Sequence, residues 1–303
     1  MFYYSFNNFL RERFGERVQK ITLDAGMTCP NRDGTKGTGG CIYCDPRGSG
    51  NDGRKKYPDI KSQVIAGKNF LSKRYKAKKF IVYFQSFSNT YASVEKLKEM
   101  YDPAVSVPGV VGLSVATRPD CLSEEVLDLL SGYTDKLMVW LELGMQSSCD
   151  ATLKRINRGH TYKEFLNGFE LAKKHPLLIC VHIIIGLPGE QKKEMRVTAG
   201  ELARLKPDGV KIHSLYISKN TRLEDMYHKK EFVPLEQHEF INTACDILEV
   251  LPEKTVIHRL TGDPVPGELV APQWAGDKHR TLQLIEKEME RRGSRQGCLV
   301  GAS

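Results

Sequence analysis

Three of the eight cysteines of this 303-residue chain lie close together near its N-terminus. Cys29, Cys41 and Cys44 are separated by eleven residues and then by two, in a Gly- and Thr-rich stretch that is typical of a loop. Thiolates are soft ligands that suit zinc and iron–sulfur centres. A closed zinc site needs four ligands, and neither a second Cys-x-x-Cys nor a histidine pair supplies the fourth. Three thiolates therefore favour a 4Fe–4S cluster with one open iron, and a redox pair or chance clustering are the alternatives.

The composition is that of a globular protein with a surplus of positive charge. Hydrophobic residues make up 40% of the chain and charged residues 27%, and the net charge is +8. No run of about 18 apolar residues predicts a membrane span, and the charged first 20 residues do not resemble a secretory signal. We expect a cytoplasmic protein, in which clustered cysteines bind metal rather than form disulfides. The charge favours an anionic partner such as nucleic acid, with a solvated basic surface as the alternative.

Six apolar, β-branched runs recur along the chain, and helix-like segments separate them. The runs span residues 18–24, 79–84, 109–117, 136–144, 176–186 and 209–218. This alternation predicts a parallel sheet with right-handed crossovers. Apolar side chains on both faces of the strands fit a sheet that is covered on both sides.

The positions of the polar residues select between the two folds that such a sheet allows. A polar or glycine-rich cluster follows each strand, where β/α barrels place their active sites, whereas a doubly wound sheet concentrates its site at one switch point. We therefore expect an α/β fold with a partial (β/α)6 TIM-type barrel over residues 1–220. Residues 221–303 would form a C-terminal helical extension that closes the open side of the barrel, with helices near 235–250 and 277–292.

Longer motifs indicate a family. The chain contains ELGMQS at 142–147, TLKRINRGHT at 152–161 and HIIIGLPGE at 182–190, which together resemble the Elongator catalytic subunit and oxygen-independent coproporphyrinogen oxidase. It also contains TLDAGMTCPNRDG (22–34), FQSFSNTYA (84–92), SVATRPDCL (114–122), KIHSLYISKNT (211–221) and HRLTGD (258–263). The combination closely resembles the YtqA/YhcC-type proteins of the radical S-adenosylmethionine (SAM) superfamily, and the resemblance covers nearly the whole chain.

The resemblance implies a cofactor chemistry. Cys29, Cys41 and Cys44 would hold a 4Fe–4S cluster whose fourth iron binds SAM. An electron from a flavodoxin or ferredoxin would cleave SAM, and the 5′-deoxyadenosyl radical would take a hydrogen atom from the substrate. The eleven-residue gap after Cys29 departs from the common superfamily pattern and is at home in the YtqA-like and Elongator-like groups. Gln85 and Ser86 stand where Gly-Gly-Glu is usual, so we expect them near the methionyl amino group.

The same resemblance gives Tyr43, Ser114, Arg158 and Gly186 cofactor-binding roles. Tyr43 would lie near adenine and Ser114 near the ribose. Arg158 would meet the SAM carboxylate, for which a guanidinium has the right bidentate geometry. Gly186 would let the backbone approach adenine. The alternatives are loop packing for Tyr43, loop hydrogen bonding for Ser114 and an ordinary strand-to-helix turn at Gly186.

Three polar residues on apolar strands are further candidates. Glu142 and Gln146 alternate on one face of the fourth strand and would lie in the barrel mouth near the nucleoside. Because an unpartnered carboxylate is costly inside a strand, a structural ion pair at Glu142 is the alternative. His182 would contact the ribose or be a satisfied core histidine. His213 and Tyr216 are candidates for the substrate side.

Our leading functional hypothesis is a radical SAM enzyme that modifies tRNA at the C5 side chain of the wobble uridine. Its motivation is the Elongator-like motifs, the YtqA resemblance and the basic charge. A suitable reaction is conversion of a carboxymethylaminomethyl substituent toward an aminomethyl one. Two alternatives are a radical SAM enzyme that acts on a small metabolite or tetrapyrrole, and a non-catalytic iron–sulfur or zinc protein that binds RNA.

Overall fold

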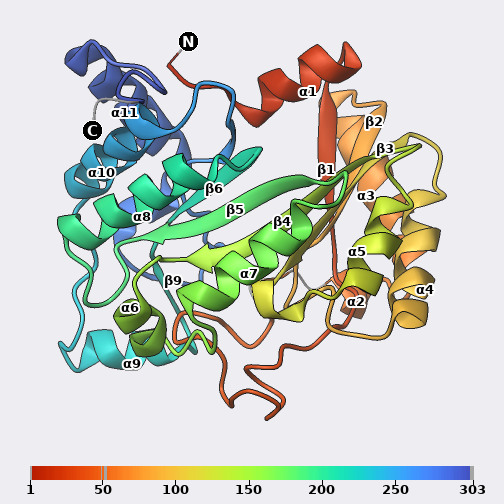
Figure 1. Ribbon diagram of the computed structural model, residues 1–303, viewed down its shortest axis with the longest axis horizontal. Coiled ribbons are helices and arrows are strands. Elements are labelled where there is room, and N and C mark those ends of the chain that lie inside the picture. The colour runs from red at the N-terminus through yellow and green to blue at the C-terminus, as the bar shows by residue number, and fades with distance from the viewer. Residues whose placement is uncertain (1, 49, 51–52, 301–303) are drawn as a thin grey trace.

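The computed structural model describes residues 2–48, 50 and 53–300, and its main feature is a curled parallel sheet. Seven parallel strands follow in the order β1-β2-β3-β4-β5-β6-β8. They are β1 (Val18–Leu23), β2 (Lys79–Phe84), β3 (Val110–Thr117), β4 (Met138–Gln146), β5 (Leu178–Ile185), β6 (Gly209–Ser214) and β8 (Val256–Arg259). The sheet forms a half-barrel with helices along its outer face (Figure 1), so the expected partial α/β barrel is confirmed.

Helices connect successive strands and cover the outer face of the sheet. They are α2 (Gly53–Lys56), α3 (Ile60–Tyr75), α4 (Val94–Val105), α5 (Glu124–Ser131), α6 (Asp150–Arg155), α7 (Tyr162–Ala172), α8 (Lys192–Leu205), α9 (Arg222–His228), α10 (Gln237–Val250) and α11 (Lys278–Arg292). α10 and α11 match the two helices expected in the C-terminal extension. None of the helices in the described ranges has both the length and the apolar character needed to cross a membrane.

The seventh strand is the main difference from the sequence-based expectation of six strands. β8 has only four residues, Val256–Arg259, and it pairs in parallel with β6. It follows a long excursion through β7 (Ile217–Ser218), α9 and α10, and the chain after it returns as β9 (Leu269–Ala271), which pairs antiparallel with β7. The segment after residue 220 therefore contributes to the sheet as well as to its covering helices, and a domain boundary at that residue stays a prediction.

Local sequence signals explain where several helices begin. The Thr161 side chain accepts a hydrogen bond from the backbone N–H of Glu164, whose carboxylate accepts from the Thr161 N–H, which makes a full capping box at α7. Ser93 caps α4 and Ser123 caps α5 in the simpler way, through a side-chain oxygen that accepts a backbone N–H. These caps fix the start of each helix just after the loop at the C-terminal end of a strand.

The N-terminal end of the half-barrel is closed by α1 (Phe6–Phe14), which packs against β1 and β8. Ser5 extends this contact with an isolated parallel bridge to Ile257 of β8. Inside this end, buried apolar side chains form a core that includes Leu10, Val18, Ile81, Met138, Trp140, Cys180 and Val256. The barrel interior is therefore packed at this end.

Candidate active site

A cavity of about 380 Å³ opens at the C-terminal ends of the strands, where the sequence predicted the site. Nine of the twelve residues expected to bind metal or cofactor line it. These are Cys29, Cys41, Tyr43, Cys44, Gln85, Glu142, Gln146, Arg158 and His182. The other three, Ser86, Ser114 and Gly186, are buried and lie outside the described lining.

The loop after β1 brings the three thiols to one wall of this cavity. Cys41 is buried, and Cys29 and Cys44 are half-buried. The guanidinium of Arg158 lies 3.7 Å from the Cys41 sulfur, and that of Arg32 donates to the backbone oxygens of Cys44 and Asp45 at 2.9 Å and 2.6 Å. Both guanidinium groups thus place positive charge beside the thiol wall of the cavity.

The eleven-residue insert between Cys29 and Cys41 is fixed by side chains of its own. Asn31 is buried, and its amide donates to the Asn157 carbonyl oxygen at 2.5 Å. The amine of Lys36 forms ion pairs with Asp120 and Glu164 at 2.7 Å and 3.0 Å. The insert is thus bound to the loop after β3 and to the start of α7, rather than extending freely from the barrel.

Glu142 of β4 is the centre of the cavity floor. Its Oε1 accepts hydrogen bonds from Lys20 at 2.6 Å and Ser114 at 2.5 Å, and its Oε2 accepts from His182 at 2.7 Å and Lys211 at 3.0 Å. Burial alone would raise the pKa of Glu142, but Lys20, Lys211 and His182 hold it well below its usual value. Glu142 thus forms the buried ion pairs that were the alternative to a cofactor role, and the same side chain also lines the cavity.

Two of the three basic groups that contact the Glu142 carboxylate have shifted pKa values in the same environment. Burial lowers the pKa of Lys211 to about 8 despite the attraction of Glu142. Burial and Lys211 lower the pKa of His182 to about 4, so its ring is neutral and donates its Nε2 proton to Glu142. Tyr83 completes the floor, because its hydroxyl accepts a hydrogen bond from Lys211 at 2.8 Å and its ring lies 4.5 Å from the Lys20 amine.

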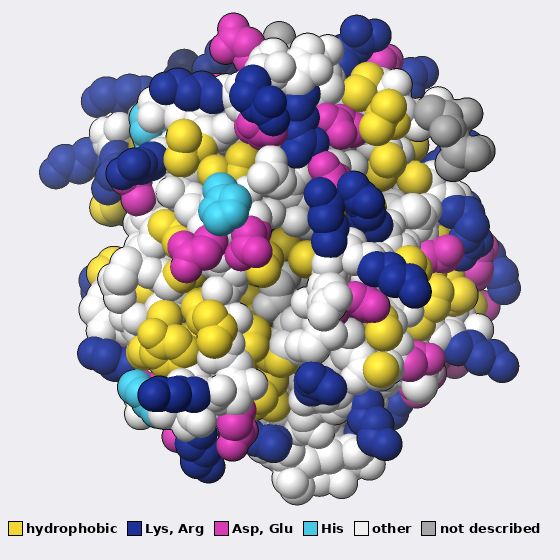
Figure 2. All heavy atoms as spheres, turned by 90° about the vertical axis from the view of Figure 1, so that its left-hand side faces the viewer, with side chains coloured by type: hydrophobic (Ala, Val, Ile, Leu, Met, Phe, Trp, Pro, Cys, Tyr) yellow, Lys and Arg dark blue, Asp and Glu magenta, His cyan; other side chains and the backbone are white. Residues whose placement is uncertain are grey.

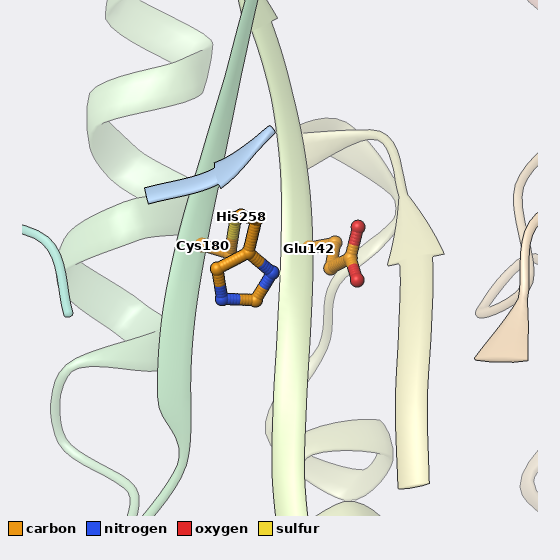
Figure 3. A group of neighbouring side chains, drawn as sticks. All are labelled: Glu142, Cys180 and His258. Atoms are coloured by element: carbon orange, nitrogen blue, oxygen red, sulfur yellow. The ribbon is translucent and has the colours of Figure 1, made fainter. Parts of the chain in front are cut away.

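A second group of potential metal ligands lies below this floor. Side-chain atoms of Glu142, Cys180 and His258 approach within 4.8 Å of one another. Figure 3 shows these three side chains, but two observations argue against a metal among them. The carboxylate already accepts four hydrogen bonds, and the Lys20 and Lys211 charges beside it repel a cation. The His258 ring stacks on Phe6 at 4.1 Å, so this group is part of the packed core.

Arg158 belongs to a buried network on the cluster side of the cavity. Its Nη2 donates to the Gly144 carbonyl at 2.8 Å, and its Nε donates to His160 Nε2 at 2.9 Å. Burial and two nearby guanidinium groups lower the pKa of His160 to about 3, which leaves the ring neutral and able to accept this bond. Arg118 makes loop contacts: it pairs with both carboxylate oxygens of Asp120 at 2.9 Å and donates to the Arg158 carbonyl at 2.7 Å.

Three polar side chains have buried oxygen atoms that no described residue satisfies; two of them, Tyr43 and Ser86, are predicted site residues. The buried oxygen atoms of Tyr43, Ser86 and Ser88 have no hydrogen-bond partner among the described residues. Such groups are costly to bury unless something satisfies them. Gly186 follows β5 with φ of +88°, a conformation that favours glycine. The turn itself therefore explains a glycine at this position, whether or not Gly186 contacts a ligand.

Sequence reasoning missed three cations that the structure makes prominent: Lys211 and Arg259 line the cavity, and Lys20 contacts its floor through Glu142. Lys20, Lys211 and Arg259 come from β1, β6 and β8, and each is a cation on or beside an apolar strand. The signal was present, because a buried Lys in a strand needs an acidic partner as much as Glu142 does. Their meeting could not be read from the sequence, since β1 and β4 are brought together by the curl of the barrel.

The whole chain can now be compared with known proteins. Residues 32–202 match the radical SAM superfamily, and residues 207–291 match the radical SAM C-terminal domain. The chain belongs to the radical SAM superfamily. It is 40% identical to the uncharacterized protein YtqA of Bacillus subtilis and 36% identical to protein YhcC of Escherichia coli K12. These matches cover 97% and 98% of this chain, and 92% and 94% of the two relatives.

More distant relatives of this radical SAM protein include larger enzymes. A tRNA uridine(34) acetyltransferase of Methanocaldococcus infernus is 29% identical over 194 residues, which is 62% of this chain and 35% of that enzyme. The structure of the archaeal Methanocaldococcus infernus Elp3 superposes with a TM-score of 0.71 at 21% identity, covering 93% of this chain and 65% of that one. At this identity the superposition establishes a shared fold.

Membership makes this radical SAM protein an enzyme whose cofactors are a 4Fe–4S cluster and SAM, and the non-catalytic alternative loses its support. The residues present fit these groups. Three thiols face one cavity, as an iron–sulfur cluster requires, and no fourth protein ligand accompanies them among the described cysteines. The unsatisfied oxygen atoms of Tyr43, Ser86 and Ser88 supply hydrogen-bonding groups for a polar cofactor nearby.

Proposed function

We propose that Cys29, Cys41 and Cys44 hold the cluster and that SAM binds beside it in the cavity at the C-terminal ends of the strands. When bound, these cofactors supply a 5′-deoxyadenosyl radical that takes a hydrogen atom from the substrate. What the chain itself supplies is position and charge. Arg158, fixed by Gly144 and His160, is set to meet the SAM carboxylate beside Cys41.

The remaining cofactor roles follow the walls of the cavity. Tyr43 and Gly186 are assigned to adenine, Ser114 and His182 to the ribose side, and Gln85 and Ser86 to the methionyl amino group. Glu142 and Gln146 lie on the same face of β4, and we assign them to the nucleoside. Ser114 and His182 both donate hydrogen bonds to the Glu142 carboxylate. We therefore assign them an indirect role, in which they orient that carboxylate toward SAM.

We propose tRNA as the substrate, with the C5 side chain of the wobble uridine as the reacting group. One observation carries this proposal: the alignment of 62% of the chain with a tRNA uridine(34) acetyltransferase. This chain spans about a third of the length of that enzyme, so the proposal transfers the substrate and not the acetyl transfer. We favour conversion of a carboxymethylaminomethyl group toward an aminomethyl group, in the cytoplasm, with a flavodoxin or ferredoxin as electron donor.

The distribution of charge supports an RNA partner. Exposed basic residues lie in segments that border the cavity end of the barrel: Arg54, Lys55, Lys56, Lys219, Arg222, Lys229 and Lys230. Lys and Arg side chains are also spread over the face seen in Figure 2, between acidic and apolar side chains. Such a surface attracts a phosphate backbone over a broad area and predicts binding that weakens with salt.

The proposal is tested by comparing tRNA nucleosides from cells with and without the gene by mass spectrometry. We expect the deletion to accumulate a wobble uridine with an unprocessed C5 side chain, and re-expression of the wild-type chain to restore the product. A complementing copy with Cys298→Ala should also restore it, whereas Cys41→Ala should not. Identical nucleoside profiles with and without the gene would rule the tRNA proposal out.

A small tetrapyrrole-like substrate is the second candidate, because the chain is 30% identical over 172 residues to the oxygen-independent coproporphyrinogen-III oxidase-like protein HemZ of Bacillus subtilis. Salt dependence separates the two. An RNA substrate predicts affinity that falls steeply between 50 and 200 mM salt, roughly in proportion to the number of phosphates contacted. A small substrate predicts turnover that is nearly insensitive to salt and to added tRNA.

A further inference from the structure

One wall of the cavity is formed by residues of β6 and β8. Lys211 and His213 lie two residues apart on β6 and face the cavity together, and Arg259 of β8 is the register partner of Lys211. All three side chains line the cavity. This wall is basic, and it is separate from the guanidinium groups of Arg32 and Arg158 beside the cysteines.

Among the described residues, the positive charge in this part of the cavity exceeds the negative charge. Lys20 and Lys211 share one carboxylate, that of Glu142, which already accepts four hydrogen bonds. Within the described residues, Arg259 has no carboxylate within ion-pair distance. Three cations therefore face one anion, and leaving a partly buried cation uncompensated is costly. A bound anion would restore the balance.

The two acidic residues that also line the cavity are engaged elsewhere. Asp263 is exposed and pairs with Lys278 at 3.2 Å. Asp45 pairs with Arg47 at 3.0 Å and accepts the Arg47 backbone N–H. Neither forms an ion pair with Arg259, so within the described ranges no carboxylate neutralises it, which leaves that role open to a ligand.

The hydrogen bonds of the wall leave donors facing the cavity. Arg259 donates Nε to the Thr261 carbonyl at 2.5 Å and Nη2 to His213 Nδ1 at 3.3 Å, and its Nη1 has no partner among the described residues. Because His213 Nδ1 accepts, the neutral ring carries its proton on Nε2. Burial and Arg259 hold the pKa of His213 well below its usual value, in keeping with that neutral form.

We propose that Arg259 and His213 bind a carboxylate carried by the substrate and thereby place its neighbouring C–H bond in the cavity. This inference rests on the proposed function in taking the cavity as the substrate site. A carboxylate at the end of a substrate side chain reaches the floor of the cavity, whereas a backbone phosphodiester is held between two nucleosides and stays outside. A carboxylate therefore fits this wall better than a backbone phosphate. The planar fork of Arg259 matches a carboxylate, and the proton on His213 Nε2 supplies one more donor.

The test uses the holoenzyme and two synthetic anticodon stem-loops that differ only at the wobble uridine, one with a carboxymethylaminomethyl group and one with an aminomethyl group. The wild type should bind the first at least about tenfold more tightly, the effect of one charged hydrogen bond. Arg259→Gln should abolish that preference, and Arg259→Lys should keep part of it. Lys254→Gln, an exposed change before the other end of β8, should preserve it.

The outcomes separate this inference from the proposed function. If Arg259→Gln weakens both stem-loops equally, Arg259 binds phosphate and the inference is wrong. It is also wrong if the preference survives in a variant with normal iron content and melting temperature. If the wild type binds neither RNA, the tRNA proposal fails, and saturable binding of N-methylglycine but not methylamine, detected by NMR and lost in Arg259→Gln, still supports the carboxylate site. Absence of that binding in the wild type overturns it.

Discussion

The N-terminal end of the barrel interior is packed with apolar side chains, whereas the C-terminal end is hollow and lined with charge, although the same strands form both. On β4 the change takes two residues: Trp140 is fully buried against Phe6 and Phe9, and Glu142 is the centre of the cavity floor. Because alternate residues of a strand share a face, Trp140, Glu142 and Gly144 point to one interior. The layer at Glu142 is thus the boundary between core and site.

This division predicts that substitutions at the two ends act on different properties. The packed end supplies stability through burial of apolar surface. The open end holds groups whose charges are satisfied only in pairs or by ligands. Substitutions on the cavity side should change cofactor or substrate chemistry, and those on the α1 side should change the free energy of unfolding.

The largest expected effect is loss of the cluster at the open end. Substituting Cys29, Cys41 or Cys44 by Ala removes one of three thiolates, so reconstituted protein should fall from about four irons per chain to near none and should release no 5′-deoxyadenosine on reduction. Iron analysis and chromatography measure both. Cys298→Ala, at an exposed cysteine, is the control and should keep both values. Cluster and cleavage that persist in Cys41→Ala would contradict the assignment.

The next largest effect is expected at the boundary itself. Glu142→Ala leaves Lys20 and Lys211 without their shared partner, and removing one member of a buried ion pair costs about 4 kcal/mol. Urea unfolding at pH 7 measures the loss. Because the folded-state pKa of Glu142 is depressed, its stabilisation is full above the unfolded pKa and is lost as pH falls, so wild type and variant should converge in acid.

An exposed ion pair provides the comparison for that change. Glu16 pairs with Lys79 at 3.1 Å near the other end of the barrel, with both side chains about a third exposed or more. Glu16→Gln should cost less than about 1 kcal/mol, as is usual for surface pairs. Equal losses in Glu142→Ala and Glu16→Gln would show that the boundary network is not under the strong electrostatic constraint inferred here.

A smaller effect is expected from the packed end. Leu10 of α1 is only 3% exposed and packs in the core that closes the barrel. Leu10→Ala should lower the free energy of unfolding by about 3 kcal/mol through lost burial and a residual cavity. SAM cleavage per folded molecule should stay at the wild-type rate when assayed below the melting temperature. A folded Leu10→Ala protein with impaired cleavage would show that the two ends are coupled.

The two ends also differ in how far the sequence predicted them. The open end was largely predictable, because polar loops after strands and three spaced cysteines are local signals. The role of α1 in closing the packed end was not predictable from the sequence. Its outer side is charged, and its apolar side chains can be recognised as core residues only from their packing beside Trp140 and β8. β8 was missed because VIHR is short and follows a long excursion, so neither length nor alternation marks it.

Electrostatic partners show the same limit. Arg118 and Asp120 are two residues apart, so their pairing was open to sequence reasoning and was overlooked. Glu142 is separated by 122 positions from Lys20 and by 69 positions from Lys211. Its contacts with them depend on how far the sheet curls. Strand periodicity predicts which face a residue lies on, but not which strand it meets across a barrel.

The smallest predicted effect is at Glu190, in the turn after β5. Burial raises the pKa of its carboxyl from 4.5 to about 7, against hydrogen bonds from Ser147 and Thr152. The unfolded chain loses this proton first, so stability falls as pH rises from about 4.5 to 7. At about 1.4 kcal/mol per pKa unit the full shift corresponds to about 3.5 kcal/mol. Because solvent screens this half-buried carboxyl, Glu190→Gln should gain only about 2 kcal/mol at pH 8, and little at pH 4.

Urea unfolding across that pH range measures the gain, with Glu286→Gln, an exposed change on α11, as the control. The sign of the pH dependence is diagnostic. A buried ion pair usually loses its stabilising effect in acid, whereas the half-buried carboxyl of Glu190 should destabilise the protein as the pH rises. A gain that is the same at pH 4 and pH 8 would mean that Glu190→Gln acts through packing instead of charge. In that case the turn beside Gly186 would hold an ionised carboxylate, and the open end would carry one more negative charge than its geometry indicates.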